Sequence, residues 1–179
     1  MRKLTILLGL SLLGACSADE PSGTATSGKR IITANDFESV AGWNVDPSLL
    51  DRGRARSGQY AIKVDQDHEF SLTFDMPLGQ ATPSKIKHVR LEAWAYLLSE
   101  KSTGVLGVQI MEPGTNNQTF GDDIKLGDVV KAHNKWVHVS KDITLPDNIT
   151  ALQHIRLSLW RANASDAVLV DDVKLSILD

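Results

Sequence analysis

Apolar and polar residues alternate along several short segments of this chain, and this period-two pattern limits its fold more than any other feature. In a β-strand successive side chains point to opposite faces, so alternation is typical of a strand with one buried face. The pattern runs through residues 60–64, 70–74, 89–97, 105–111, 136–143, 155–160 and 167–177. Turn residues separate these segments, and none of them carries a long helical stripe. Seven or eight short strands predict an all-β antiparallel sandwich, in which each sheet packs one face into a shared core.

One segment is ambiguous. Residues 124–130 contain Ile124, Leu126, Val129 and Val130, which suit either a short helix or another strand. Gly127 lies among them and disfavours the helix, because glycine is a poor helix former.

The amino-terminal residues indicate export and lipidation. Two basic residues precede an apolar run at 4–15, which is too short for the ~20 residues that a membrane-spanning helix needs. The run ends in LGAC at 13–16, which resembles the lipobox cut by lipoprotein signal peptidase. Cys16 is the only cysteine, so it cannot form an intramolecular disulfide. We expect 1–15 to be a cleaved signal peptide and Cys16 to carry the lipid; the alternative is an ordinary secretory signal with an unrelated cysteine.

The rest of the chain divides into a linker and one domain. Residues 16–30 contain the lipidated cysteine and no large apolar residue, which is typical of a flexible spacer. Residues 31–179 are long enough for a single β domain. The formal net charge is −3, which argues against a nucleic-acid partner because such binding relies on clustered Lys and Arg. We expect a cell-envelope protein attached to the membrane by its lipid; Ser17 after the cysteine resembles the residue that favours the outer membrane in enterobacterial lipoproteins.

Several motifs occur in an order that suggests a family. NDFE at 35–38 and GW at 42–43 open the domain, and ARSGQYAIKV follows at 55–64. KWVHVS at 135–140 and LP at 145–146 come later, and VDDVKL at 170–175 closes the domain. Together they resemble a jelly-roll carbohydrate-binding module of the galactose-binding-domain-like superfamily, over about residues 34–178. The resemblance implies a jelly-roll sandwich and is less specific for ligand, because some members bind no sugar.

The two ends of the domain carry acidic residues that suggest a structural calcium ion. In the last strand Asp171 has the parity of the apolar Val173 and Leu175, which predicts that it points inward, where a carboxylate needs a cation or hydrogen-bond donors. Asp36 and Glu38 are two residues apart and are expected to share a face. The family resemblance implies a calcium held by Asp36, Glu38, the backbone carbonyl at Arg56, and Asp171 with Asp172 as its substitute. The alternative is that Asp36 and Asp171 cap turns or pair with Arg52, Arg54 or Arg56.

Strand parity also predicts a ligand-binding face. The residues expected to point away from the core in segments 89–97, 105–111 and 155–160 include Arg90, Glu92, Trp94, Tyr96, Gln109, Arg156 and Trp160. Aromatic rings stack on the C–H face of a sugar, and amide, carboxylate and guanidinium groups pair with its hydroxyls. If the three strands share a sheet, these residues line one side of it. The alternative is that a loop covers Trp94 or Trp160 in a small satellite core; Trp43 and Trp136 are expected to be structural.

No motif of an enzyme stands out. The five histidines have no partner at metal-binding spacing, and neither a nucleophile elbow nor a phosphate-binding glycine loop occurs. Two carboxylates across a cleft, as in glycosidases, remain open from sequence. We therefore expect a non-catalytic lipoprotein that binds a polysaccharide or oligosaccharide; the alternative is an envelope lipoprotein that contacts another protein and has no sugar ligand.

Overall fold

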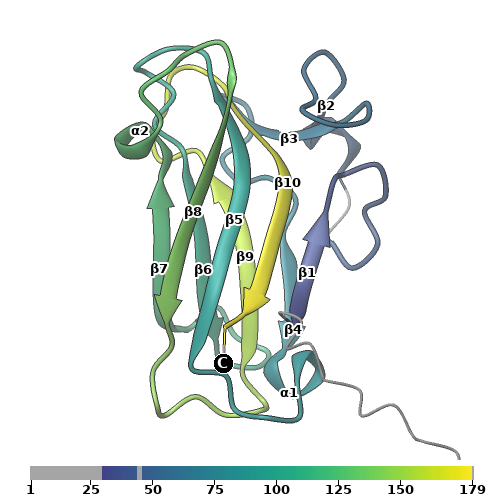
Figure 1. The fold of residues 1–179 in the computed structure, drawn as a ribbon, viewed down its shortest axis with the longest axis vertical. Helices are drawn as coiled ribbons and strands as arrows, with labels where there is room; N and C mark the ends of the chain where they lie inside the picture. Colours follow the sequence, from purple (N-terminus) through teal and green to yellow (C-terminus); the bar gives the residue numbers. More distant parts are fainter. Residues whose placement is uncertain (1–29, 44–45, 179) are drawn as a thin grey trace, which may run out of the picture.

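Two antiparallel β-sheets pack face to face in the computed structural model, which describes residues 30–43 and 46–178 (Figure 1). The six-stranded sheet contains β1 (Ile31–Asn35), β2 (Leu50–Asp51), β3 (Ala61–Val64), β5 (His88–Leu97), β8 (Trp136–Thr144) and β10 (Val168–Ile177). Its order is β2-β3-β10-β5-β8, with β1 also paired to β10. The four-stranded sheet has the order β4-β9-β6-β7 and contains β4 (Phe74–Pro77), β6 (Val105–Met111), β7 (Gln118–Lys125) and β9 (His154–Trp160).

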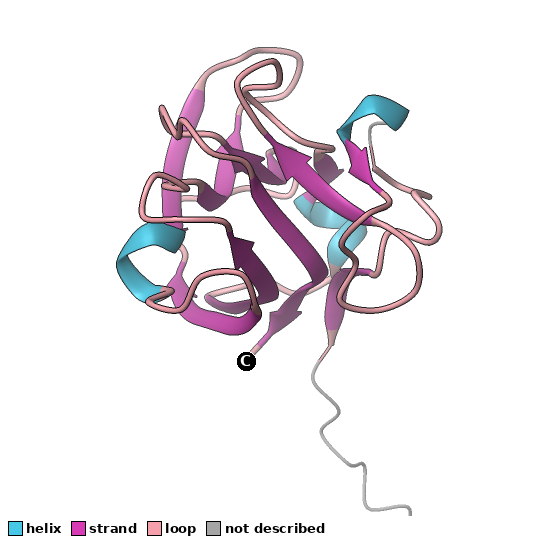
Figure 2. Ribbon diagram, turned by 90° about the horizontal axis from the view of Figure 1, so that it is seen from above, coloured by secondary structure: helices cyan, strands magenta, loops and turns pink. Residues whose placement is uncertain are grey.

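The helices of the described residues are few and short (Figure 2). They are a 3₁₀ turn (Pro47–Leu49), α1 (Leu78–Ala81) and α2 (Leu126–Val129). Within the described residues, no helix has the length and apolar content to cross a bilayer. Cys16, the signal peptide and the linker up to residue 29 lie outside the described residues.

The predicted all-β sandwich is confirmed, and strand parity decides which side chains fill its core. In β5 every second residue is buried, and the same holds for the apolar residues of β6 and β9. Leu91 and Leu157, one from each sheet, are fully buried. Each such leucine contributes roughly 1.5–3 kcal/mol of hydrophobic stabilisation relative to an exposed position. The other face of each strand, called the outer face here, is left free for polar and aromatic side chains.

Two predicted segments end differently in the structure. Residues 70–73 were expected to lie in a strand, but the regular strand β4 begins only at Phe74 and continues to Pro77. The backbone of Ser71 still bonds to the carbonyl oxygen of Leu159, so this segment runs beside β9 without regular pairing. The ambiguous segment 124–130 divides between two elements. Ile124 belongs to strand β7, which ends at Lys125, and Gly127 lies inside α2, a single helical turn that tolerates one glycine.

The last strand contains a β-bulge that the strict period-two pattern missed. The register of β10 against β5 shifts between Asp171 and Lys174, and Asp172 adopts a positive φ of 48°. An extra residue at a bulge reverses the parity of the residues before it. Asp171 therefore lies opposite Trp94 on the outer face, while Val173 keeps its place in the core. The predicted burial of Asp171 is confirmed, but the bulge places the residue on the outer face and not at the edge of the core.

Trp43 and Trp136, both expected to be structural, lie in different places and differ in burial. Trp43 is buried at one end of the sandwich, where its ring lies 5.3 Å from that of Phe37 and 5.8 Å from that of Phe74. Trp136 is half-buried on the outer face of β8 and packs edge-on against Tyr96 at 5.4 Å.

Candidate functional site

The outer face of the four-stranded sheet is hollowed into a groove. Its central part is a cavity of about 600 Å³, and two smaller hollows share several of its lining residues. The groove follows β6 and β9 from Trp160 to His154, which is ~20 Å at the usual rise of a strand. Its lining residues come from all four strands and from the loops before β4 and between β6 and β7. The central lining is Phe70, Thr73, Asp75, Gln109, Met111, Asn116, Gln118, Arg156 and Ser158.

Two exposed aromatic rings stand at one end of this groove. Phe70 is 52% exposed and Trp160 is 37% exposed, which is unusual for large apolar side chains. Their rings are nearly parallel, with centroids 6.3 Å apart and planes 17° apart. The indole Nε1 of Trp160 donates to Glu69 Oε1 at 3.1 Å, which fixes the ring orientation. The pair forms an apolar platform open to solvent.

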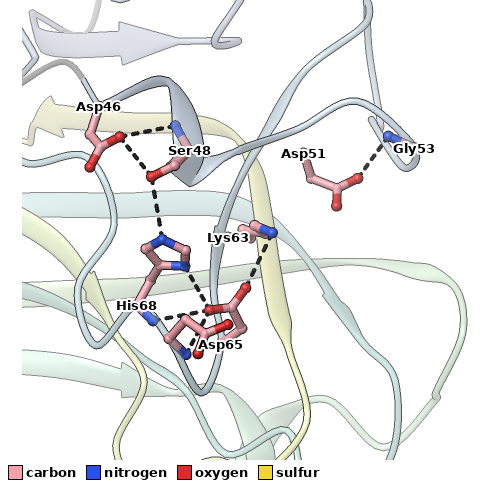
Figure 3. A network of polar contacts seen from close by, with 8 residues as sticks. Asp46, Ser48, Asp51, Gly53, Lys63, Asp65 and His68 are labelled. Atoms are coloured by element: carbon pink, nitrogen blue, oxygen red, sulfur yellow. Dashed lines mark hydrogen bonds and ion pairs between the residues drawn. The ribbon is translucent and has the colours of Figure 1, made fainter.

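Hydrogen bonds hold the segment that carries Phe70 in place. Arg161 N donates to Glu69 O at 2.8 Å on the side of β9. Just before this segment, Asp65 accepts from the backbone N–H and the Nδ1 of His68, and Lys63 pairs with its second oxygen at 3.2 Å (Figure 3). Burial would raise the pKa of Asp65, but the bonds from His68 and Lys63 outweigh it and hold the pKa below its ordinary value. The platform is therefore positioned by an ordered turn, although it lies outside any strand.

Charged side chains from β4 and β9 lie at the other end of the groove. Asp75 of β4 bonds to His154 Nδ1 with one oxygen and to Arg156 Nε at 2.8 Å with the other. Partial burial would raise the pKa of Asp75, but these two partners lower it below the ordinary value of an aspartate. Asp75 is therefore ionised at neutral pH, and Arg156 is held at the groove surface with part of its guanidinium free for other acceptors.

The floor of the groove between the two ends carries amides and a glycine. Gln109 Nε2 donates to Gln118 Oε1 at 2.7 Å, which couples the amides of β6 and β7. Gly107 lies between Ser158 of β9 and Asp123 of β7 in the sheet register. A Cβ atom at Gly107 would meet nothing closer than 3.9 Å, so the glycine leaves open space beside Trp160. A planar ligand can approach the backbone closely here.

The structure divides the predicted ligand face between the two sheets. The condition that the three strands share a sheet is not met, because β5 belongs to one sheet and β6 and β9 to the other. Gln109, Arg156 and Trp160 line the groove. Arg90, Glu92, Trp94 and Tyr96 lie on the outer face of the six-stranded sheet, on the opposite side of the molecule. Parity places a residue on the inner or outer face of its own strand but does not say which sheet the strand joins.

Polar residues of the β5 group are engaged within the protein. Arg90 Nη2 donates to Asp142 Oδ2 at 2.6 Å, and Lys174 lies 2.9 Å from Glu92. Trp94 and Tyr96 are half-buried, with the guanidinium carbons of Arg56 and Arg54 at 4.4 Å and 5.8 Å from their ring centroids. A loop thus covers Trp94, as the alternative interpretation of this residue expected.

The carboxylate of Asp171 is fully buried and accepts hydrogen bonds from the backbone. Its Oδ2 accepts from the N–H groups of Arg56 at 2.7 Å and Ser57 at 3.2 Å, and its Oδ1 accepts from the N–H of Asp172 at 2.7 Å. Burial raises the pKa of Asp171 to about 6, although these three donors act in the opposite direction. The loop presents amide hydrogens to Asp171, whereas a calcium ligand set needs the carbonyl oxygen of Arg56 to face the same point.

The remaining acidic residues of the predicted calcium set also have protein donors. Asp172 accepts from the Arg56 guanidinium at 3.1 Å and from Ser57 Oγ at 2.7 Å. Asp36 caps its own turn by accepting from the N–H of Glu38 at 3.2 Å, because the strand ends before it and Phe37 has a positive φ.

Glu38 Oε1 lies elsewhere and accepts from the N–H groups of Gln59 at 2.7 Å and Tyr60 at 2.8 Å. Across residues 30–43 and 46–178, no three His, Cys, Asp or Glu side chains converge on one point. The residues in this arrangement do not fit a calcium site, and the chelation experiment described below tests this conclusion.

Of the nine residues that line the centre of the groove, only Gln109 and Arg156 were predicted from the sequence to bind a ligand, and three of the others have contacts described above. Phe70 was assigned to a regular strand, and only its exposure beside Trp160 marks it as part of the platform. Asp75 directly follows Phe74, and its outward parity was available from the sequence once the strand was extended to Pro77. Gln118 follows a stretch of turn residues, and no sequence signal joined it to Gln109.

Comparisons with known proteins find the fold in carbohydrate-binding modules. No known protein family and no curated protein matches the chain. Among solved structures, the CBM22-1 xylan-binding domain of Paenibacillus barcinonensis Xyn10C is similar, with a TM-score of 0.54 and 14% identity over 87% of this chain and 99% of that chain. The C-terminal family 22 carbohydrate-binding module of Clostridium thermocellum Xyn10B gives a TM-score of 0.51 and 12% identity over 83% and 93%. The predicted jelly-roll, carbohydrate-binding-module-like fold is confirmed; at this identity the likeness shows the fold.

Proposed function

We propose that this chain is a non-catalytic, lipid-anchored protein that binds a stretch of polysaccharide in the groove over its four-stranded sheet. The observation that carries the proposal is the exposed Trp160–Phe70 platform at the end of an open groove lined with amides and a guanidinium. Sugar rings stack on such platforms by their C–H faces, and their hydroxyl groups pair with planar polar side chains. The ~20 Å length of the groove suits several consecutive sugar rings of an extended chain.

The comparisons suggest which polysaccharide to test first. Similar structures include domains described as xylan-binding. Xylan is a neutral chain with many hydroxyl groups, which suits a groove whose central charged side chains, Asp75 and Arg156, are paired with each other. Xylan oligosaccharides are therefore the first probes, and other neutral β-linked glycans are the comparison set.

The groove favours binding over hydrolysis. A glycosidase acid needs a carboxyl group with a raised pKa, so that it holds a proton at working pH. The pKa of Asp75 is lowered instead, and both of its oxygens are occupied by His154 and Arg156. This arrangement supports a role for Asp75 in orienting Arg156 toward ligand hydroxyl groups.

A pair of tryptophan variants tests the site. Titration of the domain with xylohexaose, followed by calorimetry and tryptophan fluorescence, should show saturable binding. Trp160→Ala should weaken this binding by at least about tenfold, because aromatic anchors carry most of the energy of such contacts. Trp94→Ala removes a tryptophan side chain from the opposite face of the sandwich and should leave the affinity for xylohexaose unchanged. Equal affinities for wild type and Trp160→Ala, or silence on a broad glycan array, would overturn the proposal.

The anchor is tested separately. A diacylglyceryl group with an added N-acyl chain holds a protein stably at a membrane, since each buried methylene contributes ~0.8 kcal/mol. Cys16→Ser should therefore move the protein from the membrane fraction to the soluble fraction of the envelope. Unchanged fractionation would remove lipidation from the proposal and leave the groove unaffected; an outer-membrane location predicts enrichment with outer-membrane vesicles.

A further inference from the structure

Three arginines in a run of five residues lie over the outer face of the six-stranded sheet. Arg52, Arg54 and Arg56 belong to the loop between β2 and β3, called the arginine loop here (residues 52–56). Each guanidinium lies over an aromatic ring: Arg52 over Tyr60 at 4.9 Å, Arg54 over Tyr96 at 5.8 Å and Arg56 over Trp94 at 4.4 Å. Such concentrated positive charge stands out in a chain whose net charge is −3.

The partners of the three arginines differ. Arg56 is paired with Asp172 at 3.1 Å, and Arg52 donates to the hydroxyl group of Tyr60. Within the described part of the chain, no carboxylate lies within 4.0 Å of the charged nitrogens of Arg54. Arg54 is exposed, and its guanidinium carbon lies 5.8 Å from the centroid of the Tyr96 ring. The N–H groups in the guanidinium plane are therefore free for an acceptor.

The loop backbone holds Arg54 in this position. Asp51 Oδ1 accepts from the N–H of Gly53 at 2.8 Å and from the N–H of Arg54 at 3.0 Å; the first of these bonds is drawn in Figure 3. On the far side of the loop, Asp171 accepts from the N–H of Arg56. An arginine with its backbone fixed and its side chain stacked loses little conformational entropy when it binds an anion.

Aromatic rings continue from the arginines across the sheet. Tyr96 packs edge-on against Trp136 at 5.4 Å, and Trp94 packs edge-on against His138 at 5.4 Å. Two parallel rows result, each with an arginine, a ring of β5 and a ring of β8. Trp136 is half-exposed and His138 is exposed, so a flat apolar group can contact them next to the arginine loop.

We propose that this face is a second ligand site, which binds the carboxylate of a uronic acid residue in an acidic polysaccharide. A planar carboxylate matches the guanidinium fork of Arg54 in a bidentate pair. The neighbouring Trp136 and His138 offer a surface for the sugar ring that carries the carboxylate, which a phosphate ion would not use. This site is independent of the groove, because the two lie on opposite faces of the sandwich.

The experiment compares two probes whose sugar chains are the same but whose carboxyl groups are either charged or esterified. Tetragalacturonate and its fully methyl-esterified form are titrated into the full domain at low ionic strength, with binding followed by calorimetry and by the NMR signals of the arginine Nε–H and tryptophan Nε1–H groups. The acidic probe should bind and shift the Arg54 and Trp136 signals, and its affinity should fall as salt is added. The ester should bind at least about tenfold more weakly, since a charge-assisted pair is lost. Equal affinity for both forms would overturn the proposal.

Variants separate a specific pair from general charge attraction. Arg54→Gln should weaken tetragalacturonate binding at least about tenfold, and Arg54→Lys should restore only part of it, because lysine keeps the charge without the planar fork. Lys101→Gln removes an exposed charge elsewhere and should change nothing. Equal effects of Arg54→Gln and Lys101→Gln, or inorganic phosphate that binds as tightly as the uronate, would overturn the proposal. Trp160→Ala should retain uronate binding, so failure of the groove leaves this site testable.

Discussion

Replacing Asp171 with asparagine tests how a buried carboxylate affects the pH dependence of folding. Burial raises the pKa of Asp171 to about 6, and its ordinary value is 3.8. A carboxyl group whose pKa is higher in the folded protein binds more protons when folded than when unfolded at intermediate pH. Its stabilising contribution is therefore fully present below pH 3.8 and is lost as the pH rises through 6.

The magnitude follows from the size of this shift. A change of about 2 pKa units corresponds to ~3 kcal/mol in the free energy of unfolding. The residue is 0% exposed, so water does not screen this contribution as it does at a surface. Asparagine keeps one acceptor oxygen and loses a hydrogen bond, which costs about 1 kcal/mol at every pH. The stability of wild type minus that of Asp171→Asn should accordingly fall by ~3 kcal/mol between pH 3.5 and 6.5.

Urea unfolding at half-unit pH steps measures this difference. Asp65→Asn is a control of opposite sign, because the pKa of Asp65 is lowered: the stability that this residue contributes is present above pH 3.8 and is lost as the pH falls through its folded pKa. The two effects occupy separate pH windows. A wild-type-minus-Asp171→Asn difference that stays flat from pH 3.5 to 6.5 would refute the reasoning.

Three further changes have defined outcomes. Gly58→Ala should destabilise the domain by ~1–3 kcal/mol in thermal unfolding, because φ is +59° and the new Cβ would lie 2.4 Å from the Glu38 carboxyl group. Gly114→Ala, where φ is +67° and the space around the new Cβ is open, should destabilise it less, and equal losses of stability would contradict the steric argument. Leu157→Ala should cost ~2–5 kcal/mol in urea unfolding through the cavity it leaves; a loss under 1 kcal/mol would place Leu157 outside the core. EDTA should leave the melting temperature unchanged, because protein donors occupy the acidic residues; a decrease that calcium reverses would restore the calcium site.

Period-two patterning predicted the parts of the fold that depend on one strand at a time. The bounds of β6 were predicted to the residue, and those of β5 and β9 within one, because each strand buries one face along its whole length. Leu91, Leu157 and the apolar residues that alternate with outward-facing residues on the same strands lie in the core for the same reason. Trp160 was placed on an outer face and lies in the groove.

Features that depend on contacts between distant segments were not available from the pattern. Trp94 and Trp160 both point outward from their strands, but β5 and β9 belong to different sheets, so the two side chains lie on opposite faces of the sandwich. One extra residue in β10 moved Asp171 to the other face, and no local signal in VDDV marks the bulge. Phe70 gained its role through bonds of its neighbours to β9, which lies about 90 residues further along the chain. Arg54 was considered only as a partner for acids, whereas it stacks on Tyr96.

The pairing of the first strand with the last has a consequence for engineering. Ile177 N donates to Arg30 O at 2.7 Å, so the two ends of the described chain meet at one end of the sandwich (Figure 1). A short peptide could join them without bending either strand, and new termini could be opened in the exposed turn at residues 146–149. Such a circular permutant would keep every strand pair while its termini, where a linker to a surface can be added, moved to another loop. The direction in which the groove faces that surface is thus a property that can be chosen.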